Sequence, residues 1–174
     1  MGGSLSYRAQ QFFQALSDSA TPEELADVQS FLSPSLYLIF SQLLPSEQAH
    51  AIRVYQRVRT EGHTDPDLLA AALLHDVGKA RVPLRPWERA LYVLGKAALP
   101  GLADRWGDRE PKGLLRGFVV KEQHPAWGAE MAASAGASAR LLRLIARHQE
   151  EDFSDLPEDE QAIMAILQAA DDVS

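Results

Sequence analysis

The sequence contains no cysteine among its 174 residues, so disulfide bonds and thiolate metal ligands are both excluded. A metal site in this protein must therefore use histidine, aspartate or glutamate, which suit Mn, Fe, Mg, Zn, Co or Ni. No apolar run reaches the length of a transmembrane helix, and the N-terminus lacks the charged-then-apolar layout of a signal peptide. We therefore expect a cytoplasmic protein with no membrane partner.

Clusters of basic residues are also missing. Lysine and arginine number 17 against 24 acidic residues, the formal net charge is −7, and no block of basic residues occurs. This balance excludes a broad nucleic-acid-binding surface, and we expect no nucleic-acid partner. An anionic substrate would still be compatible with a metal site, because bound cations set the local field.

The hydrophobic pattern is helical along the whole chain. Residues 5–17 carry apolar residues at mixed helical spacing, and further helices are expected from Pro22 and from Pro34. Thr21 and Glu24 make a capping box at the start of the second of these three helices. Only residues 36–40 and 118–120 resemble strands. The pattern predicts an all-α bundle, with a helical extension in residues 1–45 and the main domain in residues 46–174, packed as a single globular unit.

The most informative stretch is residues 68–79, which read LLAAALLHDVGK. An apolar run that should form a buried helix, started by Asp65 and Pro66, ends in His75 and Asp76. An imidazole and a carboxylate at the end of a buried helix are costly unless something pairs with them. The following Gly78 is expected to allow a tight turn.

Other segments supply partners for this pair. His50, expected one turn into a helix capped by Ser46 and stopped by Gly62, shares the apolar i, i+4, i+8 face with two valines. Asp171 lies four residues after Leu167 on a buried stripe, whereas Asp172 turns away from it. Two further histidines lie beside helical segments. His124 precedes a proline and is expected at a helix N-terminus, and His148 ends an apolar helix. Each alone would be interpreted as a hydrogen-bonded core residue, but together they predict a metal site.

The order His50, His75-Asp76, Asp171 resembles the H…HD…D signature of the HD superfamily of metal-dependent phosphohydrolases. His124 and His148 resemble the additional histidines of the two-metal members, and the likeness covers roughly residues 45–174. It implies an HD-domain helical bundle that binds one or two divalent ions. The implied metal ligands are His50, His75, Asp76, His124, His148 and Asp171, with Asp76 as the bridge.

The resemblance also implies a reaction: hydrolysis of a small phosphorylated substrate, such as a nucleotide, by a metal-activated water. The catalytic residues would be Asp76 and Lys79, with Lys79 near the substrate phosphate and Arg53 a further candidate for offsetting charge. Alternatively, Lys79 is a helix-terminal lysine that interacts with carbonyl ends. His148 is preceded by arginine rather than histidine, and no GYP motif follows, which argues against cyclic-di-GMP as substrate.

Two other functions fit the same ligands. The first is a non-enzymatic domain that binds a metal or nucleotide as a sensor, in which chelation would lower the melting temperature although no substrate is turned over. The second is a di-iron oxygenase, which would consume O₂ in an iron-dependent reaction. Residues 100–113, which include Trp106, are expected to form a loop that is either a lid or an ordered insertion.

Overall fold

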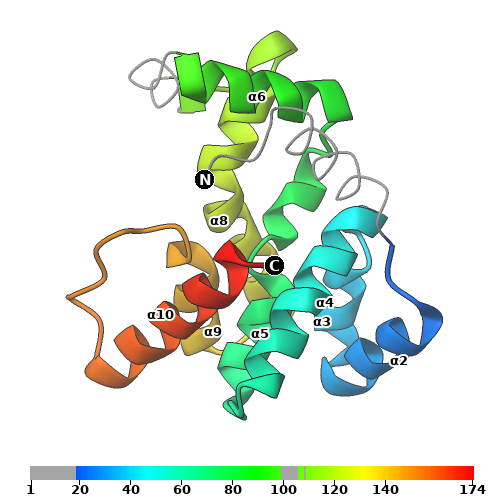
Figure 1. The fold of residues 1–174 in the computed structure, drawn as a ribbon, viewed down its shortest axis with the longest axis vertical. Helices are drawn as coiled ribbons and strands as arrows, with labels where there is room; N and C mark the ends of the chain where they lie inside the picture. Colours follow the sequence, from blue (N-terminus) through cyan, green and yellow to red (C-terminus); the bar gives the residue numbers. More distant parts are fainter. Residues whose placement is uncertain (1–18, 99–105, 108) are drawn as a thin grey trace, which may run out of the picture.

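In a computed structural model, residues 19–98, 106–107 and 109–174 are described, and every regular element among them is helical (Figure 1). The predicted helix at residues 5–17 lies outside this part of the chain, as do residues 100–105 and 108 of the predicted loop at residues 100–113. The helices are α2 (Pro22–Phe31), α3 (Pro34–Phe40), α4 (Pro45–Thr60), α5 (Pro66–Leu74), η1 (Val77–Arg81), α6 (Pro86–Ala98), η2 (Gly113–Leu115), α8 (Arg116–Ser134), α9 (Ala139–Arg147) and α10 (Glu158–Asp172).

The centre of the bundle is α5, the helix with the apolar run. Every side chain from Leu68 to Leu74 is buried. Helices α4, α9 and α10 pack around α5, and α8 packs on η1 and α9. Figure 1 shows α5 in the middle, with α9 and α10 on one side of it and α4 on the other. A helix that is apolar on all faces must be enclosed in this way, and its C-terminal end therefore delivers His75 and Asp76 into the protein interior.

Helices α2 and α3 add to the same core. Val28 and Phe40 are fully buried in one hydrophobic cluster with α4 and α5. The capping box predicted at Thr21 and Glu24 is confirmed, because each side chain accepts a hydrogen bond from the other residue's backbone N–H. How residues 1–45 divide from the main domain remains a prediction.

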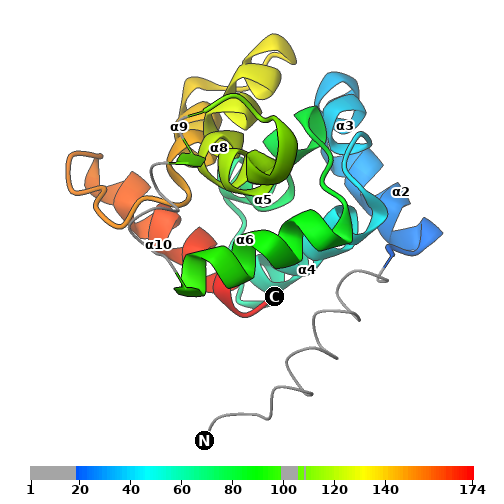
Figure 2. The ribbon, with the colours of Figure 1, turned by 90° about the horizontal axis from the view of Figure 1, so that it is seen from above.

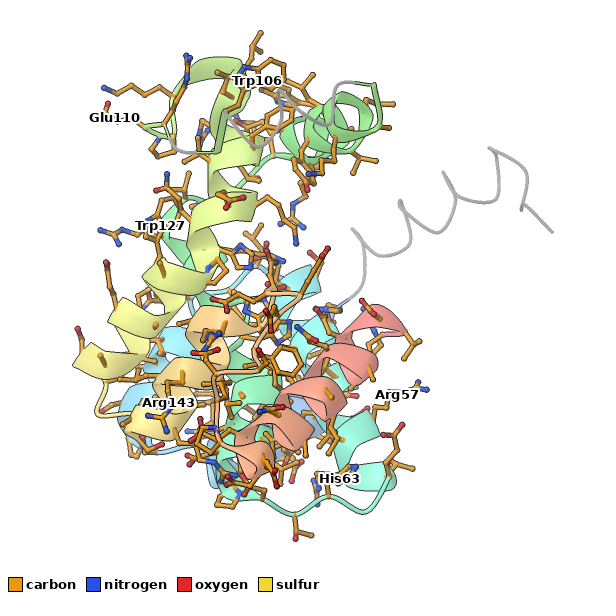
Figure 3. The ribbon with its side chains drawn as sticks, turned by 90° about the vertical axis from the view of Figure 1, so that its left-hand side faces the viewer. Arg57, His63, Trp106, Glu110, Trp127 and Arg143 are labelled. Atoms are coloured by element: carbon orange, nitrogen blue, oxygen red, sulfur yellow. The ribbon has the colours of Figure 1, made fainter. Side chains whose placement is uncertain are left out.

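Helix α6 lies apart from the central helices, at the end of the bundle where α4 begins. Figure 2 shows it lying across that end, and Figure 3 places Trp106 near it and His63 at the opposite end of the molecule. A buried ion pair ties α6 to α4, between Arg89 and Glu47. Among the described residues, no helix combines the length and apolar character needed to cross a membrane. The α6 helix covers one end of the bundle through ion pairs and through packing on α8, where the rings of Tyr92 and Phe118 meet.

Several predicted boundaries were wrong for identifiable reasons. The α4 helix begins at Pro45 rather than after Ser46, because the Glu47 carboxylate accepts the Leu44 N–H at 3.2 Å and so closes the N-terminus without a side-chain cap. Both strand-like runs are helical, the first in α3 and the second, residues 118–120, in α8. Short apolar runs fit a buried helix as well as a strand, and here burial decides.

The largest boundary error concerns α8, which was expected to begin at His124. The helix begins at Arg116 and passes through Pro125 without a break. Proline inside a helix removes one backbone hydrogen bond and leaves the Lys121 carbonyl without its usual donor. The His124 side chain replaces that donor, since its Nδ1 lies 3.0 Å from the Lys121 oxygen and 2.9 Å from the Val120 oxygen. The interior proline is therefore tolerated because a neighbouring side chain takes up the free carbonyl.

Asp65 is the N-cap of α5, as predicted, and replacing it should destabilise the protein. Its carboxylate accepts the Leu68 N–H at 2.9 Å and the Arg140 guanidinium at 2.7 Å. We expect Asp65→Ala to lower the free energy of unfolding by about 1–2 kcal/mol at pH 7 in urea denaturation. Asp65→Asn keeps a capping oxygen and should lose less; equal losses would contradict a capping role.

The effect of this substitution should depend on pH. Burial alone would raise the pKa of Asp65, but the hydrogen bonds from Leu68 and Arg140 outweigh it and lower the pKa. A carboxyl whose pKa is lowered by folding stabilises the protein above its unfolded pKa of about 3.9, and this contribution is lost as the pH falls through the folded value. The difference between wild type and Asp65→Ala should therefore be largest at neutral pH and shrink below about pH 4.

Candidate metal centre

Two groups of three ligand atoms lie side by side where α5 ends. His50, His75 and Asp171 form one group, and Asp76, His124 and His148 form the other. Within each group the ligand atoms lie within 4.8 Å of one another. All six predicted ligands are therefore brought together, from α4, the end of α5, α8, the end of α9 and α10.

The first group holds its atoms at spacings suited to one cation. His50 Nε2 lies 2.8 Å from Asp171 Oδ1, and His75 Nε2 lies 3.4 Å from the same oxygen. Ligands that each lie about 2.1 Å from a shared ion are separated by about 3 Å, so the arrangement fits a single divalent cation. Asp172 is exposed on α10. The predicted preference for Asp171 over Asp172 agrees with this geometry.

Asp76 stands between the two groups. One oxygen, Oδ1, lies 3.0 Å from His124 Nε2 and 3.9 Å from His148 Nε2. The other, Oδ2, lies 3.6 Å from His75 Nε2 and also contacts the Lys79 ammonium. A carboxylate that presents one oxygen to each ligand group has the geometry of a bridge between two ions.

Three of the histidines are oriented by backbone carbonyls. The Nδ1 atom of His75 donates to the Ala72 carbonyl at 3.0 Å, and that of His148 donates to the Ile145 carbonyl at 2.8 Å. The Nδ1 atom of His124 donates to the carbonyls of Val120 and Lys121 in α8. A histidine whose Nδ1–H is held in this way presents an unprotonated Nε2, the form that binds metals. The backbone thus aims three Nε2 atoms at the centre.

One atom of the centre lacks a hydrogen-bond partner. His75 Nε2 is fully buried and makes no hydrogen bond in the described part of the chain. An unsatisfied buried nitrogen costs about 1–3 kcal/mol unless a ligand pairs with it. Together with the oxygen and imidazole donor set, this orphaned atom shows that the residues fit a divalent cation.

The charge states of the buried groups suit cation binding in most respects. Burial lowers the pKa of His148 to about 3, and it lowers the pKa of His124 as well, so both imidazoles are neutral. Burial alone would raise the pKa of Asp76, but Lys79 and His75 outweigh it and hold the pKa well below its usual range. His75 differs: burial opposes protonation, yet the carboxylates of Asp76 and Asp171 outweigh it and raise the pKa. At His75, protonation of Nε2 therefore competes with metal binding more strongly than at His124 or His148.

The tight turn predicted at Gly78 takes the form of a short helical turn, in which the Lys79 N–H donates to the Asp76 carbonyl at 2.9 Å around Gly78. Gly78 lies in the short helix η1 with an ordinary backbone conformation. Its role is close packing, because a Cβ atom at this position would lie 2.0 Å from the His124 carbonyl oxygen and 2.6 Å from the Gly128 nitrogen. The missing side chain lets η1 approach α8 and so brings Asp76 within reach of His124. Gly128 and Ala132 are buried small residues of α8, whereas Ala133 is exposed.

The residues around the centre include several that sequence reasoning missed. A cavity of about 570 Å³ opens beside His148 and Asp171 and is also lined by Lys121. Lys121 precedes His124 by three residues and therefore shares its face of α8, a signal that was lost when the helix was expected to begin at His124. A second cavity, beside His50 and Asp76, is bordered by Arg53, Lys79 and by the Glu47–Arg89 pair, which α6 and α4 bring together.

Comparison with known proteins gives one match. The family model described as HD domain matches residues 48–174, whereas no curated protein and no solved structure matches the chain. The matched segment exceeds half of the chain and contains all six residues of the candidate metal centre. The chain therefore belongs to the HD domain family, within the superfamily of metal-dependent phosphohydrolases.

Proposed function

We propose that this protein is a metal-dependent phosphohydrolase that acts on a nucleotide or a related small phosphate ester through a metal-activated water. The observation that carries the proposal is the position of Asp76, whose two oxygens face different ligand groups around an orphaned buried Nε2. Paired divalent ions supply Lewis-acid stabilisation of phosphoryl oxygens and lower the pKa of water. Family membership supports the same reaction class.

The chain's own residues would contribute binding, orientation and charge. His50, His75 and Asp171 would hold one ion, and His124 and His148 the other, with Asp76 between them. The backbone carbonyls keep the imidazoles in the metal-binding tautomer, so the site is organised before substrate arrives. The Lys79 ammonium, held against Asp76, would offset part of the negative charge of a phosphoryl group.

The proposal is tested by hydrolysis and metal analysis of protein purified without added metal or chelator. We expect about two metal equivalents per chain and turnover of a phosphomonoester or phosphodiester with the metal found. About one equivalent would restrict the chemistry to a single ion. Metal binding without hydrolysis of any ester would favour the sensor hypothesis. If the protein binds no metal after reconstitution with Mn, Fe, Co and Zn, the proposal of a metal-dependent enzyme is refuted.

Metal removal should also lower thermal stability. A cation that binds the folded centre and has little affinity for the unfolded chain stabilises the protein by about 2.7 kcal/mol at a hundredfold excess over its Kd. We expect dialysis against a chelator to lower the melting temperature by at least about 5 °C, and re-addition of metal to restore it. An unchanged melting temperature would show that the centre holds no tightly bound ion.

A further inference from the structure

A small apolar cavity adjoins the metal centre beneath α6. Its volume is about 240 Å³, and its apolar wall is made by side chains from α6, α8 and the segment after η1: Val82, Leu84, Tyr92, Val93 and Val120. An apolar cavity of about 150 Å³ in another protein holds benzene, so this one has room for a single ring. The cavity borders Lys79, whose ammonium contacts the Asp76 carboxylate, and it is therefore adjacent to the ligand groups.

The charged residues that line this cavity are paired, with one exception. Glu47 pairs with Arg89, and Lys79 pairs with Asp76. The Lys121 ammonium makes no direct hydrogen bond or ion pair with residues in the described ranges, although the carboxylates of Asp76, Asp171 and Glu122 attract it from a longer distance. Lys121 lines both this apolar cavity and the larger one beside His148 and Asp171. A solvent-accessible cation that is not held in a direct ion pair with any described residue thus stands where an apolar cavity meets the metal centre.

We propose that the substrate is a phosphate ester whose organic group carries an apolar ring, that this ring lies in the cavity, and that Lys121 binds the phosphate. The inference rests on the proposed function and narrows its substrate class to esters of apolar groups. Two features support it together. The wall offers apolar side chains and Tyr92, whose ring packs against Phe118, and the Lys121 ammonium at the junction suits an anion. The apolar part of the wall offers no partner to the hydroxyl groups of a sugar, so the inference selects the small phosphate esters of the proposed function over its nucleotides.

The experiment measures binding of two phosphonates to the metal-loaded protein by calorimetry. Phenylphosphonate and methylphosphonate carry the same anionic group, have no ester bond to hydrolyse, and differ in the ring. Burying a phenyl ring should make phenylphosphonate bind at least about tenfold more tightly. Equal affinities, or binding of neither compound, would overturn the inference.

Two adjacent positions on α6 provide a matched pair of variants. Val93 lines the cavity, whereas Leu94 does not, and their side chains are 54% and 68% exposed, so neither substitution removes a buried side chain. We expect Val93→Asn to reduce the preference for phenylphosphonate at least about threefold, and Leu94→Asn to leave it unchanged. An unchanged preference in Val93→Asn would place the ring elsewhere and overturn the assignment of this cavity.

A second pair tests the cation. Lys121→Gln should weaken both phosphonates alike, by about tenfold, while their affinity ratio is kept. Lys112, an exposed lysine that pairs with Glu110, serves as the control, and Lys112→Gln should bind both compounds as wild type does. Wild-type affinity in Lys121→Gln would refute its role in phosphate binding.

Hydrolysis by the wild-type protein separates this inference from the proposed function. Turnover of phosphate esters together with equal affinities for the two phosphonates would overturn the substrate class alone. A protein that binds phenylphosphonate preferentially but hydrolyses no ester would support the cavity assignment and contradict the proposed function.

Discussion

Replacing Asp76 by asparagine is expected to reduce turnover of phosphate esters by about a thousandfold or more and to remove at least one metal equivalent per chain. The carboxylate is 4% exposed, and its two oxygens face His75 on one side and His124 on the other. An amide of the same size leaves one oxygen ligand in place of two and removes the negative charge that balances a cation. Turnover and elemental analysis on the same preparation measure both effects.

Neighbouring carboxylates at the end of α10 provide the control for this result. Asp171→Asn should lose metal and activity, because Asp171 Oδ1 lies within 3.4 Å of two imidazole nitrogens. Asp172→Asn changes the same chemical group one residue later, on an exposed side chain, and should retain full metal content. Full metal content and full turnover in Asp76→Asn would contradict both the bridge and the proposed mechanism.

Gly78→Ala should be among the most destabilising single substitutions in this chain, with a loss of about 3 kcal/mol or more in the free energy of unfolding. The new methyl group would meet the His124 carbonyl oxygen at 2.0 Å and the Gly128 nitrogen at 2.6 Å. Both are backbone atoms of α8, so they cannot move aside as a flexible side chain can. The helix η1 would have to separate from α8, which would draw Asp76 away from His124.

Gly136 provides a matched glycine for this measurement. It has a positive φ of 83°, and no atom of the described residues lies within 4 Å of the position that a Cβ would take. Gly136→Ala should therefore cost only about 1 kcal/mol, from backbone strain alone. Urea denaturation of both variants separates steric conflict from strain, and a Gly78→Ala variant that unfolds at the wild-type midpoint would refute the packing argument. The melting temperature of metal-loaded Gly78→Ala should also respond less to a chelator.

Most helix beginnings follow from local chemistry and could therefore be predicted. Thr21 and Asp65 are N-caps of helices whose first residue is a proline. Each capping side chain accepts a hydrogen bond from the backbone N–H only three residues later, so the signal is local. The start of α8 could not be predicted in this way. Pro125 normally marks a helix start, and only the contact between the His124 side chain and the carbonyls one turn earlier lets the helix continue through it.

The sequence by itself predicted the helical class, and its resemblance to the HD superfamily predicted the six candidate ligands. Each ligand is a polar residue on or at the end of an apolar helix, and hydrophobic periodicity decides which face of a helix is buried. It also distinguished Asp171 from Asp172, because a change of one position turns a helical side chain by about 100°.

Only the tertiary structure decided which atoms meet. Four features join segments that are distant in the sequence: the distances between the ligand atoms around Asp76, the close packing at Gly78, the Glu47–Arg89 pair and the cavity beside Lys121. Local propensity acts over about one helical turn, whereas these contacts depend on how α4, α6 and α8 pack around α5. A hydrophobic pattern indicates that a side chain faces inward. Which groups that side chain then contacts depends on how the helices pack against one another.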